Sequence, residues 1–154
     1  MKDHRRNHYP HHEFLYSLVV GDGIDNVNVA IERLLFALSF RSKLDGTGYI
    51  KEAIALWYEM PATSRVVLSN DIYPQIAANV RSTSERVERS IRNALRDCHV
   101  HGKLIWLNDL VQSEIVSPRY APTNGEFLSS VVSWLRIQHR EHNRQMSLFK
   151  YIDA

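Results

Sequence analysis

The stretch at residues 83–98 constrains the fold more than any other part of the chain. On a helical wheel of ~100° per residue, its apolar side chains gather within one third of the circle, opposite a polar set. The apolar set is Val87, Ile91, Ala94, Leu95 and Cys98. The polar set is Arg86, Arg89, Arg92, Asn93 and Arg96. The pattern predicts a helix that packs on a core along one face and carries guanidinium groups on the other.

A shorter helix is expected just before it, over residues 70–80. Asp71 is the expected N-cap, which places Pro74 in the first turn, where a missing N–H costs little. Ala77 is small, as two closely packed helix backbones require. The side chains expected to face the longer helix are Ile76, Ala77 and Val80.

The turn between the two helices is short, over residues 80–82. Ser82 and Glu85 fit the S/T-x-x-E capping box, so Ser82 is the expected N-cap of the longer helix. Two helices joined in this way are typical of a helix-turn-helix, whose second helix enters the major groove of DNA.

Side-chain chemistry then suggests roles for the outer face. Arg89 and Arg92 can each donate two parallel hydrogen bonds to guanine, and Glu88 can accept one from a cytosine amine. Arg86, Asn93 and Arg96 are better placed as phosphate or flanking contacts. The helix N-terminus at Ser84 can donate N–H groups to a phosphate. Further candidate phosphate contacts from loops are Arg65, Lys103 and Arg119.

An ordinary solvated face is the alternative interpretation. Glu85 and Arg89, like Glu88 and Arg92, are four residues apart and can pair on any helix surface. For an isolated helix that would be the commoner outcome. The full row of arginines, the suitable preceding helix and the short capped turn favour DNA binding here.

Composition fits one domain with a real core. The chain has 154 residues, 44% of them hydrophobic, and a net charge of only +2, so a local basic stripe matters more than the total. Long apolar runs are absent and the basic start is not followed by a cleavable apolar core, so neither a membrane span nor a secretory signal is expected. Cys98 is the only cysteine, which fits a reducing cytoplasm.

The chain as a whole divides into three parts: 1–25, 26–139 and 140–154. The first is a mobile basic, histidine-rich arm followed by an apolar run, 13–20, of undecided type. Metal binding by the arm is conceivable, but the spacing of its histidines matches no closed site, so no metal is expected. These histidines are His4, His8, His11 and His12.

The middle part is expected to be a helix-turn-helix domain made only of helices, about six in number. A helix begins near Asn26, a turn follows at residues 45–48, and the next helix stops at Pro61. A short helix is expected over residues 104–111. Thr123 caps the last helix with Glu126, and residues 140–154 extend it with a charged stretch.

Catalysis is not expected. A Cys/His nucleophilic pair of Cys98 with His99 or His101 is imaginable, but Cys98 lies on the buried stripe, where cysteine behaves as a small hydrophobe. There is no Gly-rich phosphate loop and no zinc-protease motif, so no cofactor is expected.

Four blocks of residues resemble a known family. They are residues 48–54 (GYIKEAI), 72–77 (IYPQIA), 84–94 (SERVERSIRNA) and 122–127 (PTNGEF). In this order they resemble the C-terminal DNA-binding effector domain of the master sporulation response regulator of endospore-forming bacteria, the stage-zero sporulation protein A family. The likeness runs from about Val27 to His139.

The resemblance implies a six-helix, winged-helix-like effector domain that binds promoter boxes in tandem or head-to-tail pairs. The positions matching Arg86, Glu88, Arg89 and Arg92 face DNA in that family. The helix from Thr123 onward contacts neighbouring DNA-bound subunits, so a homodimer or a tandem pair on DNA is a candidate assembly.

Three residues and one domain depart from the family pattern. Glu85 replaces a small hydroxyl residue, Asn93 a frequent histidine, and Arg81 a turn asparagine that tolerates left-handed backbone better. Full-length members carry a phosphoacceptor domain before the effector, whereas only some 25 residues precede the likeness here. Phosphorylation control of the usual kind is therefore not expected.

Two functions follow as hypotheses. The first is a transcriptional regulator that reads double-stranded DNA by sequence. The second is an interaction protein that pairs with a full-length regulator and modulates it without reading DNA. An exposed apolar stripe at Trp134 and Leu135 would favour the second.

Overall fold

The computed structural model describes residues 8–153, and within them it contains seven α-helices, one π-helical turn and no strand. The all-α prediction is confirmed, while a winged-helix β-hairpin is missing from that part of the chain. The additional helix is the apolar run left undecided above. The elements are α2 (His12–Val19), α3 (Val27–Ala37), α4 (Asp45–Glu59), η1 (Leu68–Ile72), α5 (Tyr73–Val80), α6 (Ser84–His101), α7 (Trp106–Val111) and α8 (Asn124–Asp153).

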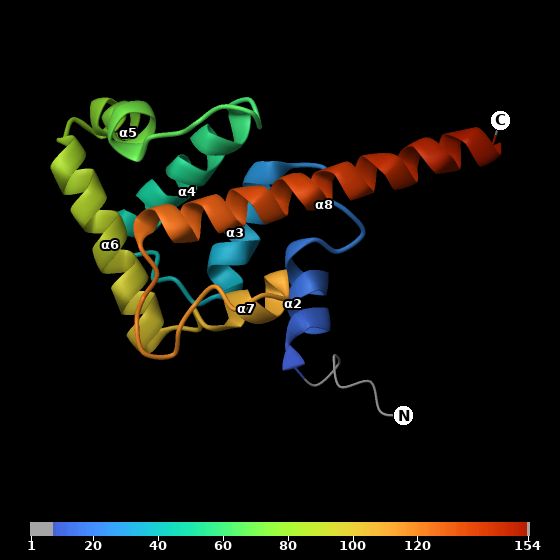
Figure 1. Ribbon diagram of the computed structural model, residues 1–154, viewed down its shortest axis with the longest axis horizontal. Coiled ribbons are helices and arrows are strands. Elements are labelled where there is room, and N and C mark those ends of the chain that lie inside the picture. The colour runs from blue at the N-terminus through green and yellow to red at the C-terminus, as the bar shows by residue number, and fades with distance from the viewer. Residues whose placement is uncertain (1–7, 154) are drawn as a thin grey trace.

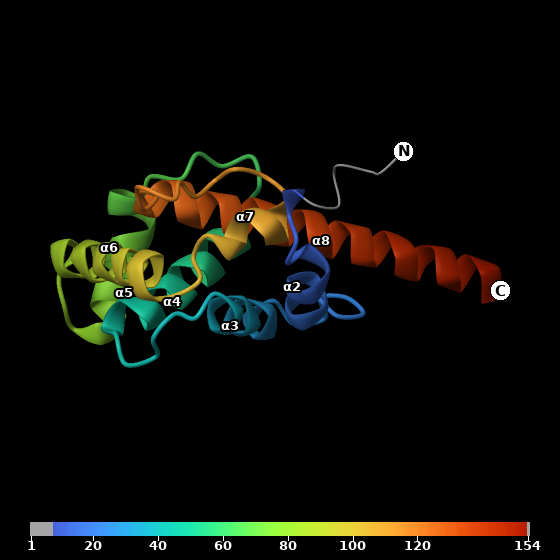
Figure 2. The same cartoon turned by 90° about the horizontal axis from the view of Figure 1, so that it is seen from below.

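The helices surround one core, and α8 runs across the molecule from end to end. Figure 1 shows α6 at one end and the C-terminal part of α8 projecting past the body at the other, and Figure 2 shows the same arrangement from below. Phe127 near the start of α8 is fully buried in the hydrophobic core, and its ring lies 5.7 Å from that of Phe40. None of the helices in residues 8–153 combines the length and apolarity that crossing a bilayer would need.

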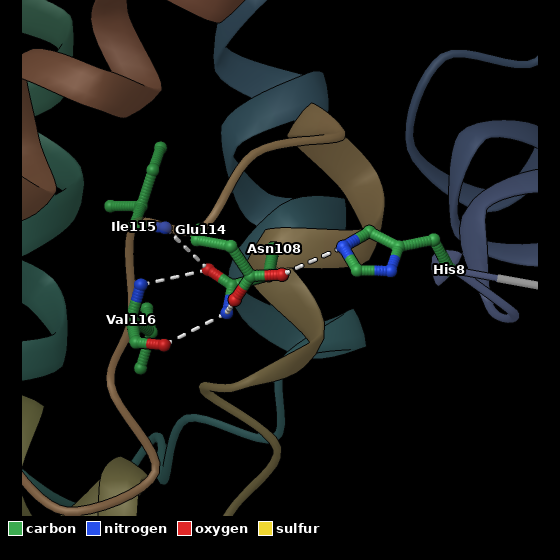
Figure 3. A network of polar contacts seen from close by, with 5 residues as sticks. All are labelled: His8, Asn108, Glu114, Ile115 and Val116. Atoms are coloured by element: carbon green, nitrogen blue, oxygen red, sulfur yellow. Dashed lines mark hydrogen bonds and ion pairs between the residues drawn. The ribbon is translucent and has the colours of Figure 1, made fainter. Parts of the chain in front are cut away.

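Part of the expected mobile arm is packed against the body. The backbone N–H of His11 donates to Asp109 Oδ2 at 3.1 Å, and its ring lies 4.4 Å from that of Trp106. His8 Nε2 lies 3.4 Å from Glu114 Oε1 (Figure 3). The prediction was therefore wrong for residues 8–12, because these aromatic and polar contacts anchor them to α7. Residues 1–7, which include His4, lie outside the described part.

A buried asparagine fixes the segment after α7. Asn108 Oδ1 accepts from the backbone N–H of Ile115 at 2.8 Å and of Val116 at 2.7 Å, and its Nδ2 donates to the Val116 carbonyl at 2.8 Å (Figure 3). These hydrogen bonds satisfy backbone N–H and C=O groups that lie outside any helix and so have no helical partner. The loop that leads back to α8 is thereby held on the core.

Helix α4 begins earlier than its composition suggests. A turn was expected at residues 45–48, but Asp45 is the first residue of the helix, and Gly46 and Gly48 lie within it. The reason is tertiary: a Cβ added at Gly46 would lie 1.9 Å from the Ser90 carbonyl oxygen of α6. Only glycine permits so close a crossing, and packing overrides the poor helix propensity of the glycines.

Helix α8 is a core element in its first half. Phe127, Val131 and Leu135 are buried completely, and Trp134 is 8% exposed. The expectation of an exposed stripe at Trp134 and Leu135 was wrong, because both side chains pack into the hydrophobic core. Beyond about residue 140 most side chains of α8 are exposed.

Arg136 joins α8 to the end of α4. Its Nη2 donates to the carbonyls of Met60 at 2.7 Å and Trp57 at 2.9 Å. Carbonyls in the last turn of a helix lack partners within the helix and carry partial negative charge. The guanidinium of Arg136 therefore caps α4 and ties α8 to its C-terminal end.

Candidate nucleic-acid interface

The short helix, the turn and the long helix occur where the sequence predicts them. Helix α5 ends at Val80, Arg81 adopts a left-handed backbone with φ of 54°, and α6 starts at Ser84. The N–H of Ser82 donates to the Ala77 carbonyl at 2.9 Å, which closes the turn. Arg81 takes the left-handed conformation although asparagine or glycine would adopt it with less strain.

Three local expectations at this motif were wrong. Thr83, not Ser82, is the N-cap of α6, and its Oγ1 accepts from the N–H of Arg86 at 3.2 Å. Asp71 does not cap α5: it lies in η1, and its carboxylate accepts from the N–H of Val67 at 2.7 Å. Val80, expected to face α6, is 37% exposed at the last position of α5 and is not one of the buried contacts.

The two faces of α6 are as the helical wheel predicts. The apolar set, defined above as Val87, Ile91, Ala94, Leu95 and Cys98, is at most 1% exposed. Ile76 and Ala77 of α5 are buried as well. Arg86, Arg89, Asn93 and Arg96 are exposed, and Arg92 is half-buried. The helix is thus held by one flank and presents its arginines to solvent.

One of the two expected surface ion pairs is present. Arg92 Nη1 lies 2.9 Å from Glu88 Oε1, four residues away on α6. Within residues 8–153, Arg86, Arg89 and Arg96 have no carboxylate within ion-pair distance. These three guanidinium groups are therefore available to an anionic partner, whereas Arg92 must share its charge with Glu88.

A cavity of about 390 Å³ separates α6 from the start of α8. Its lining includes Glu88, Arg92 and Arg96 from α6 and residues 121–125. The Nε of Arg92 is buried and has no hydrogen-bond partner among the described residues, so one N–H donor of this guanidinium is still unused. Two arginines of α6 and the residues at the start of α8 therefore line the same cavity.

Sequence reasoning missed a buried polar connection behind this cavity. Asn124 Nδ2 donates to the Tyr73 hydroxyl at 3.0 Å and to the Glu88 carbonyl at 3.1 Å. Burial raises the pKa of Tyr73, so its hydroxyl stays protonated at neutral pH. Asn124 thereby ties α5, α6 and α8 together. The only sequence signal was a polar residue directly after the capping Thr123.

The remaining candidate contacts are more scattered. Ser84 is half-buried in the first turn of α6, where backbone N–H groups are free of helical partners. Arg65 is exposed in the loop between α4 and η1. Arg119 is exposed in the loop after Ser117, whose carbonyl lies 2.7 Å from His99 Nε2 near the far end of α6. Lys103 follows that far end and lies over the ring of Trp106, 5.2 Å from its centroid.

Cys98 is part of the core, as the stripe indicates. It is fully buried, its Sγ donates to the Leu38 carbonyl at 3.1 Å, and burial raises its pKa to about 12. A thiol held neutral and shielded in this way is not a nucleophile at neutral pH. Within residues 8–153 no cluster of three or more metal-ligating side chains occurs.

Fold and surface together define a helix-turn-helix protein whose second helix bears free cationic side chains. The comparison with protein families agrees with this class. Over residues 31–135 the chain matches the family described as the C-terminal domain of sporulation initiation factor Spo0A. Because the match covers most of the chain, the protein belongs to this family, whose members are DNA-binding effector domains in sporulation transcription rather than enzymes.

Proposed function

We propose that this protein is a transcriptional regulator that binds double-stranded DNA at specific sequences through α6. The observation that carries the proposal is the pairing of a fully buried flank with exposed, unpaired arginines on one helix. Burial fixes the orientation of the helix, and orientation is what allows a side chain to read a base edge.

The position and the hydrogen-bond partners of each α6 side chain indicate which part of the DNA it contacts. Arg89 is exposed at the middle of the outer face and reads a base, since a guanidinium matches guanine O6 and N7. Arg92 reads a second base with help from Glu88, which must release part of its ion pair in the complex. Arg86, Asn93 and Arg96 contact phosphates or flanking groups, and the first turn at Ser84 donates N–H groups to a phosphate.

Loop contacts and assembly complete the proposal. Arg65 and Arg119 are candidate phosphate contacts, as is Lys103 once it leaves the ring of Trp106. On DNA, subunits bind as a homodimer or as a tandem pair through the helix that follows Thr123. The protein acts in the cytoplasm, without a catalytic activity, a cofactor or a bound metal. The rival hypothesis, a modulator that never reads DNA, was favoured by an exposed stripe at Trp134 and Leu135, and both residues belong to the core instead.

The test begins with selection of bound sequences from a random DNA pool at two salt concentrations. Binding should weaken steeply with salt, because phosphate contacts release counterions. Arg89→Ala should then lower affinity for the selected site by about 1–3 kcal/mol and relax selectivity at one base position. Arg33→Ala, an exposed arginine on α3, removes the same charge and should leave the base preference unchanged.

Two results would overturn the proposal. A pool that yields no enriched sequence at low salt would exclude sequence-specific reading. Equal effects of Arg89→Ala and Arg33→Ala on affinity and base preference would show that α6 is not the reading surface.

A further inference from the structure

The second half of α8 carries a face that no other part of the described chain covers. Figures 1 and 2 both show this part of the helix projecting beyond the body. Ile137 is 46% exposed and Leu148 is 54% exposed, and Tyr151 is 85% exposed. All three lie beyond residue 135, where the family match ends. Exposed apolar side chains along a helix that projects from the body point to a contact with another chain.

Five of the exposed residues follow a heptad pattern. Ile137, Arg144 and Tyr151 are seven residues apart, and Glu141 and Leu148 are again seven apart in the intervening positions. Steps of four and three residues place all five on one stripe of a helix. We call this stripe the α8 seam: Ile137, Glu141, Arg144, Leu148 and Tyr151.

The α8 seam continues into a shallow groove on the body. That groove is lined by side chains of the loop after α7, including Ile115, and by Ser133, Trp134 and Ile137 of α8. The groove and the exposed half of the seam therefore lie along the same side of one helix. A helix that pairs with the projecting half also reaches the groove.

We propose that the α8 seam pairs antiparallel with the α8 seam of a second copy of this chain. In one register, about a point between residues 142 and 143, every seam position meets a complementary one. Ile137 meets Leu148 of the second copy, Glu141 meets its Arg144, and Tyr151 of the second copy reaches the groove beside Ser133 and the exposed edge of Trp134. By two-fold symmetry each pair occurs twice.

Charge selects this register and direction. Neither Glu141 nor Arg144 has an ion-pair partner within residues 8–153, although both are exposed at the centre of the seam. In the antiparallel pair each glutamate faces an arginine of the other copy. A parallel pair in register would bring glutamate against glutamate and arginine against arginine, which is repulsive.

The test is the mass of the protein in solution without DNA, measured by sedimentation equilibrium across a concentration series. The wild-type chain of 17.9 kDa should approach twice this mass. Leu148→Gln should raise the dissociation constant roughly tenfold or more, since the lost contact occurs twice. Met146→Gln is the matched control: Met146 is 47% exposed, lies on the opposite side of α8, and should leave the constant unchanged.

Charge exchange tests the register itself. Glu141→Arg and Arg144→Glu should each give monomers, because four like charges would meet at the centre of the pair. The double variant should dimerise again, and the two single variants should form a heterodimer when mixed. Circular dichroism should show unchanged helix content, since both residues are exposed.

The proposal fails if the wild-type chain is monomeric at high concentration, or if Met146→Gln weakens association as much as Leu148→Gln. It also fails if the double charge variant does not recover association. It stands apart from the DNA-reading proposal, because Arg89→Ala should dimerise like the wild-type chain even when it no longer selects a DNA site.

Discussion

Gly46 offers a stringent test of how the reading helix is held. A Cβ at this position would lie 1.9 Å from the Ser90 carbonyl oxygen, 2.6 Å from the Ser90 carbonyl carbon and 2.9 Å from the Ala94 Cβ. Carbon and oxygen atoms rarely approach more closely than ~3.3 Å, so Gly46→Ala must move α4 away from α6 by more than ~1 Å. Because the obstacle is backbone, no side-chain rotation relieves it.

The expected loss is at the upper end of what inserted methyl groups cost in packed cores, about 3 kcal/mol. For a chain of this size, that lowers the melting temperature by roughly 6–12 °C. Gly48→Ala is the matched control, since it lies on the same helix and a Cβ there meets nothing within 4 Å. It should stabilise the protein by up to ~1 kcal/mol, because alanine is the better helix former.

Urea denaturation followed by circular dichroism measures both variants against the wild-type chain. The two alanines should shift the midpoint in opposite directions. If Gly46→Ala were as stable as Gly48→Ala, the close crossing of α4 and α6 would not exist as described.

Three further predictions concern other contacts. Arg136→Ala should lower the unfolding free energy by about 1–3 kcal/mol, since it leaves the last carbonyls of α4 without a charged donor. Arg136→Lys keeps a positively charged donor and should recover part of the lost free energy in the same urea assay. Asn124→Ala should lower the unfolding free energy by a similar ~1–3 kcal/mol, measured by calorimetry, because it leaves the buried Tyr73 hydroxyl without its donor. Asn79→Ala, at an exposed position of α5, is the control and should change the unfolding free energy very little. Cys98, with a pKa raised to about 12, should resist a thiol reagent at pH 8 in the native protein and react at once in urea. Between pH 9 and 12 only the thiol of the unfolded chain ionises, which favours unfolding. The unfolding free energy of the wild-type chain should therefore fall more steeply with pH than that of Cys98→Ala. Rapid labelling of the native protein would contradict the burial of Cys98.

Helical periodicity predicts the reading helix well because its signal is local. The buried and exposed sides of α6 follow from spacing alone, and Val87 and Arg89 lie where the wheel puts them. The same reasoning placed the capping Thr123 correctly: its Oγ1 accepts from the N–H of Glu126 at 3.1 Å. An apolar pattern that repeats over several helical turns leaves little choice about which face of the helix is buried.

The failures share a different cause, which is that distant residues decide the outcome. Gly46 looks like a turn residue until α6 is placed against it, and Trp134 looks exposed until the rest of the core packs around it. The hydrogen bond from Asn124 to Tyr73 joins residues 51 positions apart, so no local pattern could indicate it. Capping by Thr83 instead of Ser82 is a one-residue error, typical of helix boundaries.

Because α8 is one unbroken helix, its length sets the distance between the two DNA-reading helices of a paired protein. Asn124 ties the first turn of α8 to α6, and the α8 seam fixes the register in which the α8 helices of two copies lie side by side. At ~1.5 Å per residue, the starting ends of the two helices stand ~55 Å apart. That span corresponds to about 16 base pairs at ~3.4 Å each, well beyond one turn of the duplex. A paired protein would therefore suit widely separated half-sites, or hold two duplexes together, and the number of residues in α8 would set the gap.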